Sequence, residues 1–544
     1  MKNRLVSKIQ ETLSSLDFPN AKIIIQIPRI PEHGDFASNI ALMLTKELKQ
    51  NPMIIAKSIV EKLLLLDKEN IFDSIDIAKP GFINFKLNQD IYTKKLVDIV
   101  KNPITYGKSE IGKDKRALVE FVSANPTGPL TVGHGRGAML GDTASNILEW
   151  NGYDVQREYY FNNAGRQMRV LGQSVFARYT EICGKAINFP EDGYQGEYIK
   201  EIAQLVFDEN SDTLLNSEDS IVFKNKAESF IFEEIKNAMK QLGLVFDTFF
   251  NENELYDSGA IDKVISDLKT MNLVYENNGA TWMKLTAMGR DTDKVMIKST
   301  GEPTYRLPDI AYHRDKFERG YDLIVDVFGT DHTDTYPDVS AAIKTLGYPE
   351  EKLKTLIHQF VTILKDEKQI KMSTRKANYI TLEELVDDVG ADVVRFFFIM
   401  RGMNSHLNFD LSVAKNQSDE NPVFYLQYAH ARVCNIIKRA DAYGHQIDIS
   451  SDCSMLSTDI EEKLLKKLLE FPEVIQHAHQ TLEPQEIANY LMATAGIFHK
   501  FYAHAKVITD DKLLTSARLV LVEAVRIVLL NGLTVLGISA PERM

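Results

Sequence analysis

Cysteine, proline and long apolar runs are scarce in this sequence. Its 544 residues include 17 prolines and three cysteines, Cys183, Cys434 and Cys453, which stand far apart. Because no two cysteines form a CxxC pair, a zinc knuckle or a redox motif is excluded, and a reducing compartment is expected. The first residues lack the apolar run of a signal peptide, and no segment reaches the roughly 18 apolar residues that cross a bilayer. We therefore expect a cytoplasmic protein without zinc and without a membrane partner.

The charge balance also excludes one class of function. The chain carries 63 basic and 76 acidic side chains, and its net charge is −13. The net negative charge repels a polyanionic partner, so such a partner must bind local basic patches. This argues against non-specific coating of nucleic acid. The 44% of apolar residues is typical of a globular protein with a sizeable core.

Hydrophobic periodicity divides the chain into three parts. Residues 1–108 combine amphipathic helical patterns with short strand-like runs and are predicted to form an α+β domain. In residues 109–414, apolar strand candidates alternate with helical stretches, which is typical of a parallel α/β sheet. The strand candidates lie at 117–122, 155–161, 323–328 and 356–364. Residues around 170–300 are predicted to be a helical insertion in that part.

From residue 415 to residue 544 the strand signal disappears. Helical periodicity alone predicts helices at 422–439, 459–477, 484–505 and 513–530. The predicted fold class is therefore α/β: a doubly wound parallel-sheet nucleotide-binding catalytic core with an N-terminal α+β domain and a C-terminal all-helical bundle.

A glycine-rich turn follows the strand candidate at 117–122. Gly133, His134 and Gly135 stand at the start of an expected helix. Glycine lets a ligand approach the backbone, and the helix N-terminus favours negative charge, so the turn is typical of a phosphate or nucleotide site. No Lys-Ser/Thr follows it and its spacing is not GxGxxG, which excludes a Walker loop and a dehydrogenase fingerprint. The alternative is a turn that serves tight packing only.

A cationic segment, 366–378, follows the last strand candidate. It carries Lys368, Lys371, Arg375 and Lys376. Several cations on a loop are suited to neutralising charge on a departing pyrophosphate. The alternative is a solvated surface loop, because charge runs are usually surface.

Together these two segments resemble the signature pair of class I aminoacyl-tRNA synthetases. Thr131-Val-Gly-His134 resembles HIGH, and Lys371-Met-Ser-Thr-Arg375 resembles KMSKS. Longer stretches resemble the arginyl-tRNA synthetase family, at 120–134, 161–167, 328–332 and 536–544. Residues 33–39 and 79–85 are similar to the N-terminal domain of that family, and 392–395 and 428–432 to its DALR-type anticodon-binding region.

The resemblance implies an arginine–tRNA ligase that uses ATP with Mg²⁺. The arginine carboxylate attacks the α-phosphate, pyrophosphate leaves, and a ribose hydroxyl of tRNA(Arg) takes the aminoacyl group. The implied catalytic residues are Thr131, Gly133, His134, Lys371, Ser373 and Arg375. The implied ATP-binding residues are Ala124, Asn125, Pro126, Gly133, His134, Gly135 and Met372. The implied arginine-binding residues are Glu120, Asn125, Tyr305, Asp309 and His332, and the implied tRNA-binding residues are Tyr428 and Arg432.

Two positions depart from the signature pair. Thr131 stands where HIGH has its first histidine, and Thr374 stands where KMSKS has its second lysine. We expect Arg375 or Lys376 to supply the missing cation.

Several alternatives remain open from the sequence. Asp309 could cap a helix after Pro308, Tyr305 could pack in the core, and His332 could be a satisfied core histidine. The basic residues around Arg432 could be the wet edge of a helix. A class I synthetase for another amino acid and a catalytically silent tRNA-binding paralogue are the competing functions. A monomer without an obligatory protein partner is expected from the resemblance.

Overall fold

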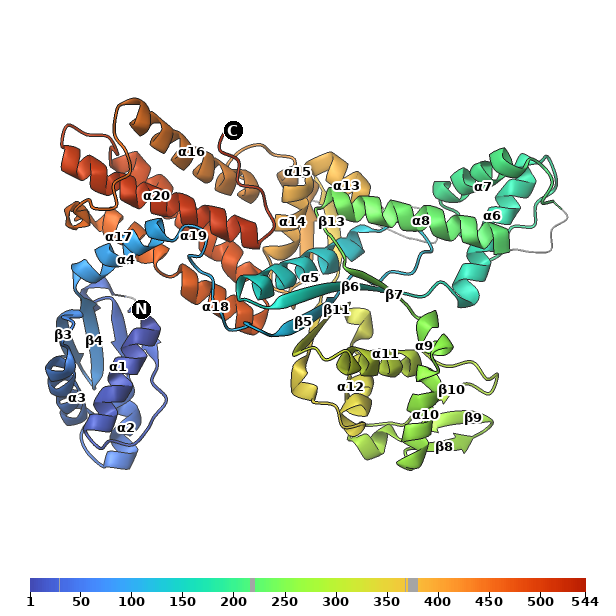
Figure 1. The fold of residues 1–544 in the computed structure, drawn as a ribbon, viewed down its shortest axis with the longest axis horizontal. Coiled ribbons are helices and arrows are strands. Elements are labelled where there is room, and N and C mark those ends of the chain that lie inside the picture. Colours follow the sequence, from blue (N-terminus) through green and yellow to red (C-terminus); the bar gives the residue numbers. More distant parts are fainter. Residues whose placement is uncertain (29, 216–220, 367, 370–379) are drawn as a thin grey trace.

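The computed structural model describes residues 1–28, 30–215, 221–366, 368–369 and 380–544. The molecule is elongated, with the N-terminal helices and sheet beneath the C-terminal helices at one end and a helical excursion at the other (Figure 1). Among the described residues, no helix combines the length and the apolar character that crossing a membrane requires.

The N-terminal part is a four-stranded antiparallel sheet covered by helices. The sheet has the order β1-β2-β4-β3, with β1 Ile25–Gln26, β2 Phe36–Ser38, β3 Phe72–Ala78 and β4 Phe82–Leu87. The helices are α1 Lys2–Ser15, α2 Ile40–Leu48, α3 Pro52–Leu66 and α4 Gln89–Lys101. Asn51 and Asn88 begin α3 and α4 because their side chains accept from backbone N–H groups of the first turn.

A five-stranded parallel sheet forms the centre of the molecule. Its order is β12-β11-β5-β6-β7, with β5 Arg116–Glu120, β6 Asp154–Phe161, β7 Thr248–Asn251, β11 Leu323–Gly329 and β12 Leu353–His358. Helix α5, Val132–Trp150, covers one face, where Arg157 of β6 contacts Asp142. The next β6 residue, Glu158, points to the other face and contacts Tyr312 of α11, Arg306–Glu318. Helices therefore cover both faces, which confirms the predicted fold class.

The stretch around 170–300 is not wholly helical. It holds α6 Gly165–Ile182, α7 Glu197–Asn210, α8 Ile221–Gln241, α9 Asn253–Asp257 and α10 Ala260–Thr270. It also holds β7, an edge strand of the central sheet, and an antiparallel sheet of β8 Val274–Asn277, β9 Ala280–Met283 and β10 Lys294–Ile297. The helical prediction missed these strands because each has four residues, too few for an alternating pattern to stand out.

The strand predicted at 356–364 is two strands in two sheets. It divides into β12 and β13, Val361–Lys365, and β13 pairs with β14, Lys368–Gln369, and β15, Leu407–Asp410. The chain turns at Gln359, whose carbonyl accepts from the fully buried guanidinium of Arg136 in α5 at 2.7 Å. The same guanidinium donates to the carbonyls of Ser405 and Gly402 at 2.9 and 3.0 Å.

The middle part of the chain also holds α12 Tyr336–Thr345, α13 Leu382–Val389, α14 Ala391–Ile399 and α15 Leu411–Ala414. The part from residue 415 to residue 544 is helical, as predicted. It consists of α16 Pro422–Ala442, α17 Asp459–Leu468, α18 Phe471–Thr481, α19 Gln485–His504 and α20 Lys512–Val535. Short 3-10 turns lie at Pro31–His33, Leu285–Met288, Thr330–His332, Glu350–Lys352 and Cys453–Met455. The helix predicted at 459–477 is divided into α17 and α18, because Pro472 has no N–H to continue the first helix.

Two contacts tie the outer parts of the chain together. Asn531 of α20 donates to the carbonyls of Pro103 and Tyr106, so the segment after α4 is held by a C-terminal helix. Arg395 of α14 pairs with Asp142 of α5, and Gly537 lies against its guanidinium with a φ of 69°.

Candidate active site

The loop that follows β5 adopts a strained backbone. Val122 and Ser123 have positive φ values of 69° and 46°, a region that L-residues rarely adopt. Tyr159 of β6 holds the loop, because its hydroxyl donates to the Ala124 carbonyl at 2.8 Å and accepts from the Ala124 N–H at 3.2 Å. A strained loop that its neighbours fix in this way is typical of a functional site.

Asn125 lies in the same loop and is fixed at both ends of its amide. Its Oδ1 accepts from the backbone N–H of Asn162 at 2.9 Å, and its Nδ2 donates to Oε1 of Gln167 at 3.2 Å. Pro126 beside it is buried. The predicted ATP-binding residues of this loop therefore hold one conformation against β6 and α6.

His134 lies in the first turn of α5 with a defined tautomer. The backbone N–H of Thr131, the N-cap residue, donates to Nδ1 of His134 at 3.0 Å. Burial lowers the pKa of His134, and Asp331 only partly opposes this shift. Because Nδ1 accepts a hydrogen bond, the proton of the neutral ring is on Nε2, which can donate to a phosphate oxygen.

The two glycines beside His134 differ in their surroundings. Among the described residues, a Cβ on Gly133 would have only the Thr131 hydroxyl nearby, at 3.5 Å, and Gly133 is exposed. A Cβ on Gly135 would lie 2.7 Å from Leu382 and 2.9 Å from Phe398. Gly133 thus leaves room for a ligand, whereas Gly135 allows α5 to pack closely against α13 and α14.

The described residues that follow the cationic segment contact the start of α5. Lys371, Met372, Ser373 and Arg375 lie outside the described residues, as do Thr374 and Lys376. The described residues that follow are bound at the predicted site: Thr381 forms a β-bridge with Thr131, and the N–H of Leu382 donates to the Leu130 carbonyl at 2.8 Å. The chain therefore leaves this segment beside His134.

Asp309 is a half-buried acid at the start of α11. The helix begins at Arg306, so Asp309 lies in its first turn and does not cap it. Burial raises the pKa of Asp309 to about 6; His313 and His332 lower it in part, and Glu120 raises it further. A carboxylate with a raised pKa among other acids favours a cationic ligand.

The structure also decides the alternatives for Tyr305 and His332. Tyr305 is 77% exposed, one helical turn before Asp309, so it is not a core residue. His332 follows β11, is 44% exposed through its side chain, and stacks on Phe328 with ring centroids 4.6 Å apart. Both residues are accessible to a ligand near Asp309.

A buried acid near Asp309, Glu252, was not among the residues predicted from the sequence. Glu252 follows β7 and is 8% exposed; its oxygens accept from the Tyr160 hydroxyl and the Asn162 amide, each at 2.7 Å. Burial raises the pKa of Glu252, which adds an acid to the same region. The only signal in the sequence was an acid just after a short aromatic run, which is too common to single out.

Tyr428 and Arg432 lie together on one face of α16. The Arg432 guanidinium lies over the Tyr428 ring at 4.3 Å from its centroid and over the Tyr502 ring at 5.0 Å. Tyr428 is 39% exposed. An arginine held against aromatic rings at the surface is suited to contacting bases and phosphates.

Comparisons with known proteins match the chain from end to end. The family model of the arginyl-tRNA synthetase N-terminal domain matches residues 3–87, that of the class I (R) tRNA synthetase catalytic domain matches 95–395, and that of the DALR anticodon binding domain matches 426–544. An arginine–tRNA ligase of Salinibacter ruber is 47% identical over 562 residues, which covers 100% of both chains. The chain belongs to the arginyl-tRNA synthetase family.

Further relatives agree with this family. An arginine–tRNA ligase of Desulfotalea psychrophila is 47% identical, with 96% of this chain and 95% of that protein covered. The fold is similar to that of the arginyl-tRNA synthetase structure from Thermus thermophilus, with a TM-score of 0.79 at 21% identity and 100% of both chains covered. Membership of the arginyl-tRNA synthetase family removes synthetases for other amino acids from the competing functions.

One assignment within the family needs correction. Residues 392–395 were expected in the DALR-type region, but they fall within the match of the class I catalytic domain, and the DALR match begins at residue 426. In the structure Arg395 pairs with Asp142 and donates to the Leu242 carbonyl at 2.8 Å. The four-letter pattern misled the prediction because Asp392 and Arg395 serve contacts between α14, α5 and the last residues of the chain.

Proposed function

We propose that this chain is an arginine–tRNA ligase whose active site is formed by the loop after β5, the start of α5 and the start of α11. The observation that carries the proposal is the junction at Thr131, where the residues that follow the cationic segment bridge to the helix that holds His134. The first signature segment and the residues that follow the second one thereby border one site.

ATP binds along the loop after β5 and the first turn of α5. Ala124, Asn125 and Pro126 face the nucleotide, and Gly133 leaves room for it. Nε2–H of His134 donates to phosphate oxygens, and the free N–H groups of the helix start favour the same negative charge. Thr131 orients His134 through the hydrogen bond to Nδ1. Lys371, Ser373 and Arg375 neutralise the departing pyrophosphate, and Met372 borders the nucleotide.

Arginine binds between Glu120 and Asp309. Asp309 accepts the guanidinium, since a carboxylate matches its planar fork of donors. Tyr305 and His332 border the same end, while Glu120 and Asn125 hold the amino end. The substrate carboxylate then faces the α-phosphate, so catalysis consists of positioning and charge stabilisation without a covalent nucleophile.

Magnesium would accompany ATP in this proposal, with phosphate oxygens as most of its ligands. The described residues contain no group of three or more His, Cys, Asp or Glu that could hold a metal ion, so Asp331, whose side chain is solvent-exposed, would be a single protein ligand. When bound, the ion would neutralise charge on the triphosphate.

The three parts of the chain divide the contacts with tRNA(Arg). Residues 1–108 contact the tRNA, 109–414 form the catalytic domain, and 415–544 bind the anticodon. Tyr428 and Arg432 take part through stacking and phosphate contact, supported by the exposed Arg432–Tyr428 pair.

Pyrophosphate exchange with each amino acid, with and without tRNA(Arg), tests the proposal. Exchange with arginine in the presence of tRNA(Arg) is expected. Exchange with lysine or cysteine but not with arginine would contradict the assignment of arginine as the substrate. If no amino acid supports exchange in the presence of tRNA, the result favours a catalytically silent paralogue.

A further inference from the structure

Three acidic side chains lie side by side across the middle of the parallel sheet. Asp326 of β11 is the register partner of Glu120 in β5, and Glu120 is the register partner of Glu158 in β6. They are 0%, 3% and 0% exposed, and we call them the carboxylate row. Adjacent buried carboxylates are costly unless cations neutralise them, so the source of those cations is informative.

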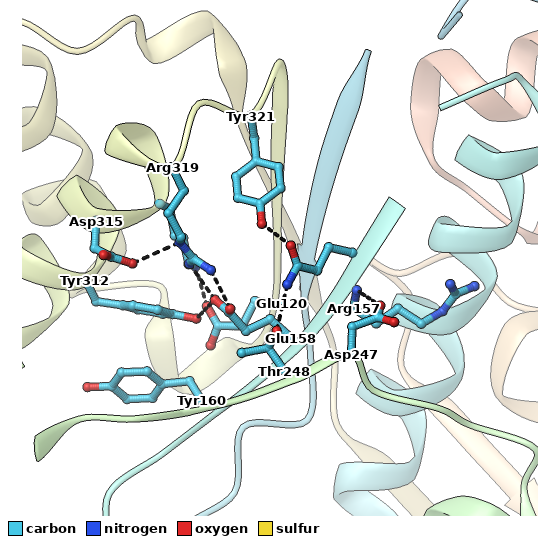
Figure 2. A network of polar contacts seen from close by, with 12 residues as sticks. Glu120, Arg157, Glu158, Tyr160, Asp247, Thr248, Tyr312, Asp315, Arg319 and Tyr321 are labelled. Carbon is cyan, nitrogen blue, oxygen red and sulfur yellow. Dashed lines mark hydrogen bonds and ion pairs between the residues drawn. The ribbon is translucent and has the colours of Figure 1, made fainter. Parts of the chain in front are cut away.

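Helix α11 supplies the cations. Nζ of Lys316 lies 2.5 Å from Glu120 and 2.6 Å from Asp326, and therefore bridges two members of the row. Arg319 binds both oxygens of Glu158 at 2.6 and 2.7 Å, and Figure 2 shows its guanidinium and the Tyr312 hydroxyl meeting Glu158. The helix is thus attached to three adjacent strands through one row of acids.

His313 extends this network to the start of the helix. Its Nε2 lies 2.8 Å from Oδ2 of Asp326, and its Nδ1 lies 2.7 Å from the carbonyl oxygen of Asp309. Although burial alone would raise it, Lys316 and His313 hold the pKa of Asp326 below its usual range, so this acid is ionised. Both partners of the ring are hydrogen-bond acceptors, so His313 joins Asp326 to the carbonyl in the first turn of α11. Lys316 of α11 and Arg319, the residue that follows this helix, are the cations paired with the three carboxylates.

The hydrogen bonds form a continuous chain between the two ends of the proposed arginine site. The chain runs from the Asp309 carbonyl through His313, Asp326 and Lys316 to Oε2 of Glu120. The other oxygen of Glu120 accepts from Ser123 at 2.7 Å in the strained loop. Helix α11 cannot shift along β5 without breaking this chain, so the backbone of Asp309, from which its carboxylate extends, is held at a set distance from Glu120.

We propose that His313, Asp326 and Lys316 are positioning residues that set the distance between Glu120 and Asp309 and thereby select the length of the substrate side chain. This inference rests on the proposed arginine site. Two anchors at a fixed separation accept arginine and reject homoarginine, which is one methylene longer, because the longer chain cannot reach both anchors without strain.

The variant Asp326→Asn tests this role, because it keeps the shape of the side chain and removes the charge that holds His313 and Lys316. We expect the KM for arginine to rise about 10- to 100-fold, as for other small misplacements of binding groups. The KM for ATP should stay unchanged, and the preference for arginine over homoarginine in kcat/KM should fall.

Glu158→Gln is the matched control. Glu158 is an equally buried member of the carboxylate row and binds the same helix, but it lies outside the chain between Asp309 and Glu120. The Glu158→Gln variant should have a lower unfolding temperature than the wild type. Its KM for arginine and its preference for arginine over homoarginine should be unchanged. Equal effects of both variants on these two quantities, or no effect of Asp326→Asn, would overturn the proposal.

His313→Gln provides a second route if Asp326→Asn does not fold, as judged by circular dichroism. Glutamine retains an N–H donor but cannot bond both Asp326 and Asp309, so the same rise in KM and loss of preference are expected. The wild-type protein separates this proposal from the function: if it shows no arginine-dependent exchange with tRNA(Arg), the proposed site fails, whereas normal exchange with unaffected variants rejects the positioning role alone.

Discussion

At the scale of single residues, the proton on His134 decides how the helix start can act on phosphate. Its Nδ1 is occupied by the Thr131 N–H, and its pKa is lowered by burial, so the ring presents one N–H and no net charge at neutral pH. In the proposed site the imidazole therefore offers an oriented N–H donor, and positive charge has to come from other groups.

His134→Ala should lower the rate of arginine activation about 100- to 1000-fold, the usual effect of losing one donor to a developing negative charge. Pyrophosphate exchange in the presence of tRNA(Arg) measures it, and circular dichroism should show an intact fold. His477→Asn, at an exposed position on α18, is the control and should keep the wild-type rate. A wild-type rate in the alanine variant would show that His134 does not donate to the triphosphate.

Asp309 predicts a pH dependence of arginine binding. Because the pKa of the unliganded carboxyl is about 6, its ionised fraction falls as the pH drops through 6, and the guanidinium needs the ionised form. The KM for arginine should rise about five- to sixfold from pH 6 to pH 5, because the ionised fraction falls from about one half to about one eleventh, while the KM for ATP changes little. A KM for arginine that stays flat between pH 5 and pH 8 contradicts this role.

Asp309→Asn separates binding from stability. The folded-state pKa lies above the usual value for aspartate, so the ionised carboxyl lowers stability above pH 6 and this penalty fades as the acid is protonated. The variant should lose arginine affinity at pH 7 and yet show a higher free energy of unfolding in urea. If the variant loses both arginine affinity and stability against urea, Asp309 has a structural role.

Candidate site residues could be named from the sequence where they lie within short motifs. Thr131, His134, Glu120 and Asp309 stand in short segments that resemble a known family, and the structure places Thr131 beside His134 and Glu120 near Asp309. The Tyr160–Glu252 contact joins residues 92 positions apart. Such a contact depends on strand order, which no local pattern reveals.

At the scale of elements, close packing at the start of α5 means that alanine should have different effects at Gly133 and at Gly135. Gly135→Ala should lower the free energy of unfolding by about 1 to 3 kcal/mol, because its Cβ would overlap Leu382 and Phe398. Gly133→Ala should leave stability nearly unchanged and raise the KM for ATP. Denaturant unfolding and exchange kinetics on both variants check this, and equal destabilisation would contradict the different surroundings of the two positions.

Element boundaries were predicted best where residues that begin or end a helix are present in the sequence itself. Pro422 and the asparagine before it begin α16 where the helical pattern was expected to start. The strand predicted at 356–364 was wrong because nothing local marks the turn at Gln359; Arg136, which is 223 residues earlier, holds it. A single apolar run cannot show that its two halves join different sheets.

At the scale of the whole molecule, the last residues of the chain connect the C-terminal helices to the catalytic helices. Gly537 lies against the Arg395 guanidinium, and Asp392 accepts from the Ser539 N–H at 3.0 Å. No pattern in the sequence predicted this docking, because it depends on how α14, α16 and α20 are placed relative to one another.

Gly537→Ala should therefore lower the apparent unfolding temperature more than Gly444→Ala. Both glycines have positive φ, of 69° and 80°, so both variants carry the backbone strain of about 1 to 2 kcal/mol. A Cβ at 537 would also overlap Arg395, whereas nothing lies within 4 Å of a Cβ at 444. Differential scanning fluorimetry compares them, and equal shifts would mean that the Arg395 contact adds nothing.

Arg136 also restricts the evolutionary changes in length that the two connections it binds can accept. Its guanidinium holds one carbonyl in the connection between β12 and β13 and two carbonyls in the connection that leads to β15. Inserting or deleting a residue in either connection would carry a carbonyl out of reach of a side chain whose position is set by α5. Relatives that vary freely at other surface loops should therefore keep these two connections at constant length.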